Sequence, residues 1–209
     1  MQRNIPAMQC DAQPHPDAAV QSDRIGCDPM QSPLDVPIVV RPFKPGDAAA
    51  VRALFIKVNS LMAPSHLAHR FETYIAAALR EEIDDIARYY AAHGGQFFVA
   101  TATGNLVAMF GLEQAEPGVA ELRRMYVDPQ IRRCGIGRGL LASAVIEARS
   151  IGCTRMILST SELQLAALVL YRNAGYREIR QEVAMTATNK SLGGAILRFH
   201  FEKALHPRP

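Results

Sequence analysis

The sequence lacks long apolar runs, paired cysteines and a strong net charge, and each absence excludes a class of protein. No stretch approaches the roughly 18 uninterrupted apolar residues that a membrane span requires. The cysteines Cys10, Cys27, Cys134 and Cys153 form no CxxC pair, which indicates neither a disulfide framework nor a zinc site. A formal net charge of +3 is too small to indicate a nucleic-acid partner. We therefore expect a cytoplasmic protein that binds no metal, no nucleic acid and no membrane.

The first 35 residues differ from the rest of the 209-residue chain. They contain five prolines and no Phe, Tyr or Trp, and they resemble neither a secretory signal nor a transit peptide. Because such a segment buries little apolar surface, we expect residues 1–35 to form a disordered tail. An arm that docks on a neighbouring subunit of a homodimer is the alternative. Residues 36–207 have the composition of a single globular domain.

Hydrophobic periodicity and turn residues predict the element order β-α-α-β-β-β-α-β-α-β-β. Strands are expected over residues 38–40, 96–101, 106–113, 119–127, 155–160, 177–186 and 195–202. Helices are expected from 51 to 58, from 65 to 93 with a break near Arg80, from 137 to 151 and from 163 to 174. This order predicts an α/β layered architecture with a mixed sheet.

Residues 127–141 form a loop rich in glycine and arginine, between a predicted strand and a predicted helix. Glycines allow backbone N–H groups to surround an anion, and the start of a helix adds positive potential. Arg132, Arg133 and Arg138 supply further positive charge. These features predict a diphosphate site.

Two common nucleotide motifs do not fit this loop. A P-loop ends in GK[ST], whereas this chain has Gly137-Arg138-Gly139. Residues 137–142 match G-x-G-x-x-A, but their first glycine lies about ten residues beyond the strand, whereas the dinucleotide motif follows its strand directly. A nucleotide-binding protein is therefore disfavoured.

Arg132-x-x-Gly135-x-Gly137, between a strand and a helix, resembles motif A of the GNAT superfamily of N-acetyltransferases. Gln164-x-x-Ala167-x-x-Leu170-Tyr171-x-x-x-Gly175-Tyr176 resembles a second family motif, although the family usually has Asn at position 164 and Phe at position 176. Residues 40–47 and 199–203 resemble the family's first and last strands. The resemblance covers about residues 37–205. It implies a single domain with a mixed, largely antiparallel central sheet flanked by helices, and acetyl-CoA as co-substrate without a metal.

The resemblance also implies how the cofactor is bound. The loop would hold the pyrophosphate of coenzyme A through Arg132, Arg133, Cys134, Gly135, Ile136, Gly137 and Arg138. The preceding strand, at Met125, Tyr126 and Val127, would offer backbone groups to the pantetheine arm, and Gln164 would add a hydrogen bond. The expected function is direct transfer of an acetyl group to a primary amine of a small molecule, amino acid or peptide. The alternative is a catalytically silent module of the same fold that binds or senses acyl-CoA.

Tyr171 is our candidate general acid, because the family's helix tyrosine lies near the thioester sulfur. Its alternative role is packing, on an apolar face with Leu170. Glu121 is our candidate general base, since it lies fourteen residues before Gly135, as the base does in histone-type relatives. Alternatives are a structural ion pair of Glu121, a water relay, or Glu113 as the base.

Three further expectations concern the walls of this site. The ion-pair alternative for Glu121 would use Arg123 or Arg177. Ser159 occupies the position at which some relatives that acetylate protein N-termini have a catalytic Glu, and a serine cannot replace it as a base. The acidic cluster of Glu81, Glu82, Asp84 and Asp85 is expected to be a solvated helix face, and attraction of a cationic amine is its alternative role. A partly aromatic pocket is expected from Tyr74, Tyr89 and Tyr90.

Overall fold

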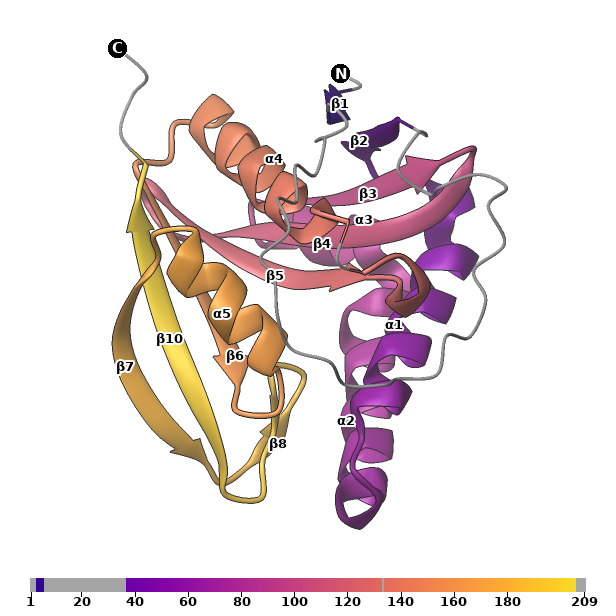
Figure 1. The fold of residues 1–209 in the computed structure, drawn as a ribbon, viewed down its shortest axis with the longest axis vertical. Helices are drawn as coiled ribbons and strands as arrows, with labels where there is room; N and C mark the ends of the chain where they lie inside the picture. Colours follow the sequence, from indigo (N-terminus) through magenta and orange to yellow (C-terminus); the bar gives the residue numbers. More distant parts are fainter. Residues whose placement is uncertain (1–2, 6–36, 133, 206–209) are drawn as a thin grey trace, which may run out of the picture.

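The computed structural model describes residues 3–5, 37–132 and 134–205 of the chain. Eight strands of this described part form one sheet in the order β1-β2-β3-β4-β5-β6-β10-β7 (Figure 1). Their bounds are β1 (Arg3–Ile5), β2 (Ile38–Pro42), β3 (Gln96–Ala102), β4 (Asn105–Glu116), β5 (Val119–Val127), β6 (Arg155–Ser161), β7 (Arg177–Ala184) and β10 (Ile196–Ala204). Neighbouring strands are antiparallel except β5 and β6, which confirms the mixed, largely antiparallel sheet.

Helices cover both faces of this sheet. The helix bounds are α1 (Ala48–Met62), α2 (Ala68–Glu81), α3 (Ile86–Ala92), α4 (Ile136–Ser150) and α5 (Leu165–Asn173). Helices α4 and α5 lie on one face, and α1, α2 and α3 lie on the other (Figure 1). The break expected near Arg80 falls at Glu82, where a short 3-10 turn (Ile83–Asp85) separates α2 from α3. A small hairpin of β8 (Ala187–Thr188) and β9 (Ser191–Leu192) lies in a segment that the sequence predicts as a loop.

At the N-terminus, the backbone of Arg3–Ile5 pairs antiparallel with β2, so this short stretch is a strand within the predicted tail. The prediction of disorder for residues 6–35 concerns positions that lie outside the described residues.

The alternation of side chains along β3 and β4 divides the core into two layers. Phe98 and Phe110 face α4 and α5, whereas Phe97 and Met109 face α1 and α3. Successive side chains of a strand point to opposite faces, so one apolar run supplies both layers. A sheet buried on both sides explains why the middle of each of these strands, residues 97–100 and 106–112, is continuously apolar.

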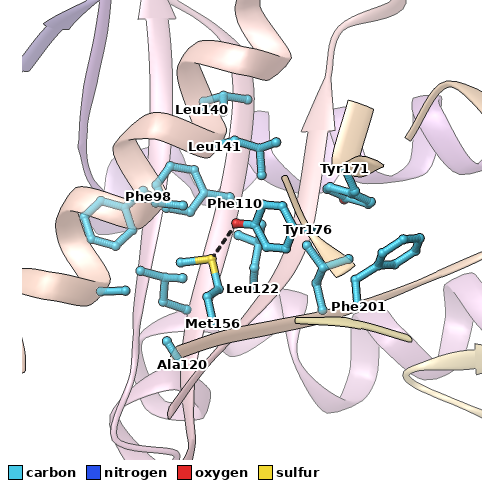
Figure 2. Close-up of a cluster of buried hydrophobic side chains, with 14 of the residues drawn as sticks. Phe98, Phe110, Ala120, Leu122, Leu140, Leu141, Met156, Tyr171, Tyr176 and Phe201 are labelled. Atoms are coloured by element: carbon cyan, nitrogen blue, oxygen red, sulfur yellow. Dashed lines mark hydrogen bonds between the residues drawn. The ribbon is translucent and has the colours of Figure 1, made fainter. Parts of the chain in front are cut away.

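The layer beneath α4 and α5 reaches from the sheet centre to α5 (Figure 2). Phe98 and Phe110 stack with ring centroids 4.8 Å apart. The Tyr176 hydroxyl donates to Met156 Sδ at 3.0 Å, and the Tyr171 ring lies 5.9 Å from the Tyr176 ring. Tyr171 thus packs at the edge of this core, on the helix that borders the candidate site.

An irregularity in β5 interrupts the alternation. The register with β4 shifts between Met109 and Gly111, and Arg124 takes a φ of +51°. A β-bulge adds a residue to one strand and redirects the side chains that follow. As a result, Arg123 and Arg124, although adjacent in sequence, both bind Glu82 on the side of α2. A positive φ in a non-glycine residue costs about 1–3 kcal/mol and is concentrated at functional sites.

Candidate active site

The candidate site is a pocket between β5 and β6. These strands pair in parallel from Val119 and Arg155 to Leu122 and Leu158, and they diverge beyond that point (Figure 1). The pocket is lined by residues of β5, β6, α5, β10, helices α1 and α2, and the β8–β9 hairpin. Among the predicted site residues, it brings together Glu121, Met125, Tyr126, Gln164 and Tyr171. Residues far apart in the sequence therefore meet where the sheet opens.

Glu121 lies at the pocket wall with its side chain 17% exposed. Lys190, on the β8–β9 hairpin, donates to Glu121 Oε2 at 2.8 Å. The alternative partners do not bind Glu121: Arg123 pairs with Glu113 and Arg177 pairs with Glu202. The expected structural pairing with Arg123 or Arg177 is therefore wrong, and Lys190, which sequence reasoning missed, is the partner.

Glu113, the reserve base, lies directly opposite Glu121 in the β4–β5 ladder. Its carboxylate is buried and accepts a hydrogen bond from Arg123. The distance from Lys190 Nζ to Glu113 Oε2 is 3.5 Å, which is longer than the 2.8 Å to Glu121 Oε2. Since a base must reach the substrate proton, the more accessible Glu121 is better placed than Glu113.

Glu82 is the centre of a buried ionic network beneath the pocket. It is fully buried, and its carboxylate accepts from Arg123 at 2.7 Å, from Arg124 at 2.7 and 3.0 Å and from the Tyr90 hydroxyl at 2.8 Å. Burial alone would raise the pKa of Glu82, but the charges and hydrogen bonds of Arg124, together with Arg123, outweigh burial and lower the pKa. The solvated helix face expected for this acidic cluster is thus wrong at Glu82.

Arg124 connects this network to the pocket rim. Besides Glu82, its guanidinium donates to the Tyr74 hydroxyl at 2.5 Å and to the Asn189 carbonyl oxygen at 2.6 Å. Tyr74 lies on α2 and Asn189 lies between β8 and β9, so one buried side chain ties both flanking elements to β5.

The expectation of a partly aromatic pocket holds for Tyr74 and not for the other two tyrosines. Tyr74 lines the pocket, whereas Tyr90 is buried behind β4. Tyr89 stacks against His93, with ring centroids 4.2 Å apart.

The Tyr171 side chain faces the pocket from α5 and is 6% exposed. Burial raises its pKa to about 12, so the phenol keeps its proton at neutral pH. A protonated phenol can donate to a departing group. Both the packing role and the acid role expected for Tyr171 are compatible with this position.

Gln164, Tyr126 and Met125 are further predicted site residues that line the pocket. Gln164 Oε1 accepts from the Thr160 hydroxyl at 2.5 Å, and this contact fixes the orientation of the carboxamide at the start of α5. The Tyr126 side chain is buried against Phe55, with ring centroids 5.9 Å apart. Met125 lies beyond the part of β5 that pairs with β6, and it lines the pocket.

The loop before α4 has the geometry of an anion site. Gly135 has a φ of +74°, and a Cβ at this position would meet nothing within 4 Å. Helix α4 begins at Ile136, and the first N–H groups of a helix lack partners within the helix, so they attract anions. Arg132 and Arg138 are exposed beside this start. Pyrophosphate binding by this loop stays a prediction, and Arg133 lies outside the described residues.

Three other predicted residues of this segment have structural contacts. A Cβ on Gly137 would lie 3.1 Å from Leu170 Cδ2, so this glycine allows α4 to approach α5. The Cys134 thiol donates to the Arg132 carbonyl oxygen at 3.6 Å. Val127 is partly buried against the core beneath α4.

No group of three or more metal-ligating side chains that could hold an ion occurs among the residues that the structure describes. Within the same ranges, no helix is long and apolar enough to cross a membrane.

Comparisons with known proteins agree with this arrangement. The model of the Acetyltransferase (GNAT) family matches residues 63–176, more than half of the chain. The match spans α2 through α5 and so includes both diverging strands and the glycine loop. The chain therefore belongs to the GNAT family of acetyltransferases.

Curated relatives resemble part of the chain. N-acetyltransferase family 8 member 3 of Rattus norvegicus and N-acetyltransferase 8 of Homo sapiens are each 32% identical to it over 114 residues. These matches cover 52% of this chain and 50% of each relative. N-acetylaspartate synthetase of Xenopus tropicalis is 32% identical over 108 residues, which are 51% of this chain and 40% of that protein. The chain thus spans about half the length, or less, of these relatives.

Solved structures share the fold. A GNAT-family acetyltransferase from Staphylococcus aureus Mu50 has a TM-score of 0.63 at 19% identity, covering 81% of this chain and 99% of that chain. A Salmonella typhimurium structure, solved with its cofactor acetyl-CoA, has a TM-score of 0.61 at 18% identity, over 82% of this chain and 95% of that chain. At these identities, the likeness concerns the fold alone.

Proposed function

We propose that this chain catalyses direct transfer of an acetyl group from acetyl-CoA to a primary amine of a small molecule, amino acid or peptide. One observation carries the proposal: Glu121 and Tyr171, a carboxylate and a protonated phenol, line the same pocket where β5 and β6 diverge. Family membership supports the choice of donor. A cytoplasmic location and a homodimer stay predictions.

Acetyl-CoA is bound and positioned by residues of β5, the glycine loop and α4. Acetyl-CoA supplies an acetyl group activated as a thioester. Gly135 and the start of α4 hold the pyrophosphate, Arg132 and Arg138 add charge, and the part of β5 beyond its pairing with β6, at Met125, positions the pantetheine arm. This anchoring converts a two-body reaction into one between groups that are already aligned.

Proton transfers accompany the exchange of bonds. Glu121 takes a proton from the acceptor ammonium, directly or through water, leaves a neutral amine and later releases this proton to solvent. The amine nitrogen forms a bond to the carbonyl carbon and gives its second proton to water, and the carbon–sulfur bond breaks. Tyr171 gives its proton to the departing sulfur and regains one from solvent. The products are an N-acetylated amine and coenzyme A.

The alternative is an acyl-CoA-binding module without turnover. The ion pair of Lys190 with Glu121 favours this alternative, because it engages one oxygen of the proposed base. The other oxygen, Oε1, is not part of that contact and stays available to an amine in the enzyme hypothesis.

A thiol-release assay separates the two hypotheses. The chain is incubated with acetyl-CoA and a panel of amines, and free coenzyme A is read with a thiol dye. Turnover that depends on an amine and is lost in the double variant Glu121→Gln/Tyr171→Phe supports the enzyme. If calorimetry shows that the chain binds acetyl-CoA but no amine causes release of coenzyme A, the chain is an acyl-CoA-binding module. This result overturns the proposed activity.

A further inference from the structure

The pocket is lined by more cationic than anionic side chains. Its charged lining residues are Glu121, Arg123, Arg124, Lys190 and Arg198. An acceptor amine enters as an ammonium ion, which like charges repel. Such a lining is therefore poorly matched to an acceptor whose only charge is its amine.

Two of the four cations are neutralised from beneath the pocket. Arg123 and Arg124 both pair with the buried Glu82, and Arg123 also pairs with Glu113. Lys190 pairs with Glu121 at the rim. Arg198 is the remaining cation of the lining.

Arg198 is incompletely compensated. Its side chain is 14% exposed, and its Nη2 donates to the Ser159 hydroxyl at 2.5 Å. Within the described residues, the carboxylate that pairs with Arg198 is Glu182, at 3.5 Å, and Glu182 lies closer to His200 and Arg180, at 3.0 Å each. Burial lowers the pKa of Arg198, and the nearby negative charge of Glu182 does not outweigh this effect.

Arg198 faces the same side of the sheet as the proposed base. Glu121 is opposite Ile157 in the parallel ladder, and Arg198 is opposite Ser161 in the antiparallel one. Residues 157, 159 and 161 of β6 share one face by alternation. The charge of Glu121 also raises the pKa of Arg198, so the two groups lie within electrostatic reach.

We propose that the acceptor is an amino carboxylate and that Arg198 is the specificity residue that binds its carboxylate. This inference rests on the proposed function. The guanidinium offers two parallel N–H donors, the arrangement that a carboxylate matches best. With the carboxylate on Arg198, the ammonium group of the same molecule faces Glu121, so one ligand complements both charges. A peptide N-terminus, whose α-carboxyl is an amide, lacks the anionic group that this position selects.

The test compares each amino acid of a panel with its own carboxamide, using thiol release by the full chain. The two members of a pair share the amine and the side chain and differ in the anionic group. The wild-type chain is expected to have a higher kcat/KM for the acid. Arg198→Met is expected to lower kcat/KM for the acid about tenfold or more and to leave the carboxamide within about twofold.

Arg180→Met is the matched control. Arg180 lies on β7, pairs with the same Glu182 and is 61% exposed, and it does not line the pocket. This variant is expected to leave both members of each pair unchanged. Arg198→Lys keeps the positive charge but lacks the two parallel N–H donors of the guanidinium, so we expect a smaller loss of kcat/KM that is confined to the acid. This variant keeps the test decisive when Arg198→Met does not fold.

Equal turnover of acids and carboxamides by the wild-type chain overturns the inference, as does an equal loss for both in Arg198→Met or Arg198→Lys. These outcomes leave amine acetylation intact. Failure of the proposed function looks different, because no amine, acid or neutral, then gives thiol release, and both proposals fall together.

Discussion

Lys190 Nζ lies 2.8 Å from Glu121 Oε2, although the two residues are 69 positions apart in the chain. The contact joins the β8–β9 hairpin to the paired part of β5 and holds the proposed base at the pocket wall. Arg124 ties the same hairpin to β5 through the Asn189 carbonyl oxygen. The proposed base therefore lies between a strand that pairs on both sides and a hairpin that two contacts hold to this strand.

Glu121→Gln should lower kcat by about 10²-fold or more, because the amide cannot accept the ammonium proton. Since the proposed pyrophosphate site, at Gly135 and the start of α4, is a separate element, the KM for acetyl-CoA should change little. Steady-state kinetics at saturating amine measures both values. Glu116→Gln is the matched control on β4, where the carboxylate pairs with Arg155 at the surface. Full kcat in Glu121→Gln would assign the proton transfer to Glu113 or to water.

Tyr171→Phe should lower kcat more than it raises KM for acetyl-CoA, because the ring still packs while the proton donor is lost. A positioned donor contributes about 10²–10⁴-fold, and the low end is expected since a thiolate is a fair leaving group. Because burial raises the pKa of Tyr171 to about 12, its titration should not limit the rate between about pH 7 and 9.

Tyr176→Phe is the matched control for this change. Its hydroxyl donates to Met156 Sδ inside the core, and it is not a lining residue of the pocket. It should keep kcat, whatever its effect on stability. Unchanged kcat in Tyr171→Phe, with chemistry shown to be rate-limiting, would make Tyr171 a packing residue only.

The proposed pyrophosphate site can be tested by placing a negative charge at Gly135. Asn and Asp tolerate a positive φ better than most residues, and open space lies beside this Cα. Gly135→Asp should weaken coenzyme A binding about tenfold or more relative to Gly135→Asn, because the added carboxylate repels the pyrophosphate. Calorimetry at low and high salt measures the difference, which screening should reduce. Equal affinities of the two variants for coenzyme A would place the pyrophosphate elsewhere.

Local patterns predicted the elements that carry this site. The strand that enters the loop, the glycine at the positive φ and the helix that follows are encoded within residues 119–150. Apolar runs in β3 and β4 indicated buried strands, because a sheet covered on both faces needs apolar side chains on both. The pairing of the strands into the observed order follows from contacts between segments distant in the sequence.

The polar framework of the pocket could not be predicted in the same way. Adjacent arginines in a strand should point to opposite faces, and only the bulge at Arg124 places Arg123 and Arg124 on one carboxylate. Glu82 follows Glu81, and both look like surface residues of one helix. The end of α2 at Glu81 turns Glu82 inward, and this depends on tertiary contacts rather than on local pattern.

Glu82→Gln should lower the free energy of unfolding by about 3 kcal/mol or more, because it leaves two buried guanidinium groups without their shared carboxylate. Glu81→Gln is the matched control, since Glu81 forms an exposed pair with its neighbour Arg80 and should change stability by about 1 kcal/mol or less. Chemical denaturation monitored by tyrosine fluorescence measures both variants.

The pH dependence of the stability lost in Glu82→Gln provides a second test. Arg124 and Arg123 hold the pKa of Glu82 below its ordinary value of 4.5 despite burial, so the folded state binds this proton less tightly than the unfolded state does. The stabilisation is therefore complete above about pH 4.5 and is lost as the pH falls through the lowered pKa. The difference in unfolding free energy between the wild-type chain and Glu82→Gln should shrink from about pH 6 to about pH 3. A difference that stays constant over this range would mean that the carboxylate charge of Glu82 does not stabilise the fold.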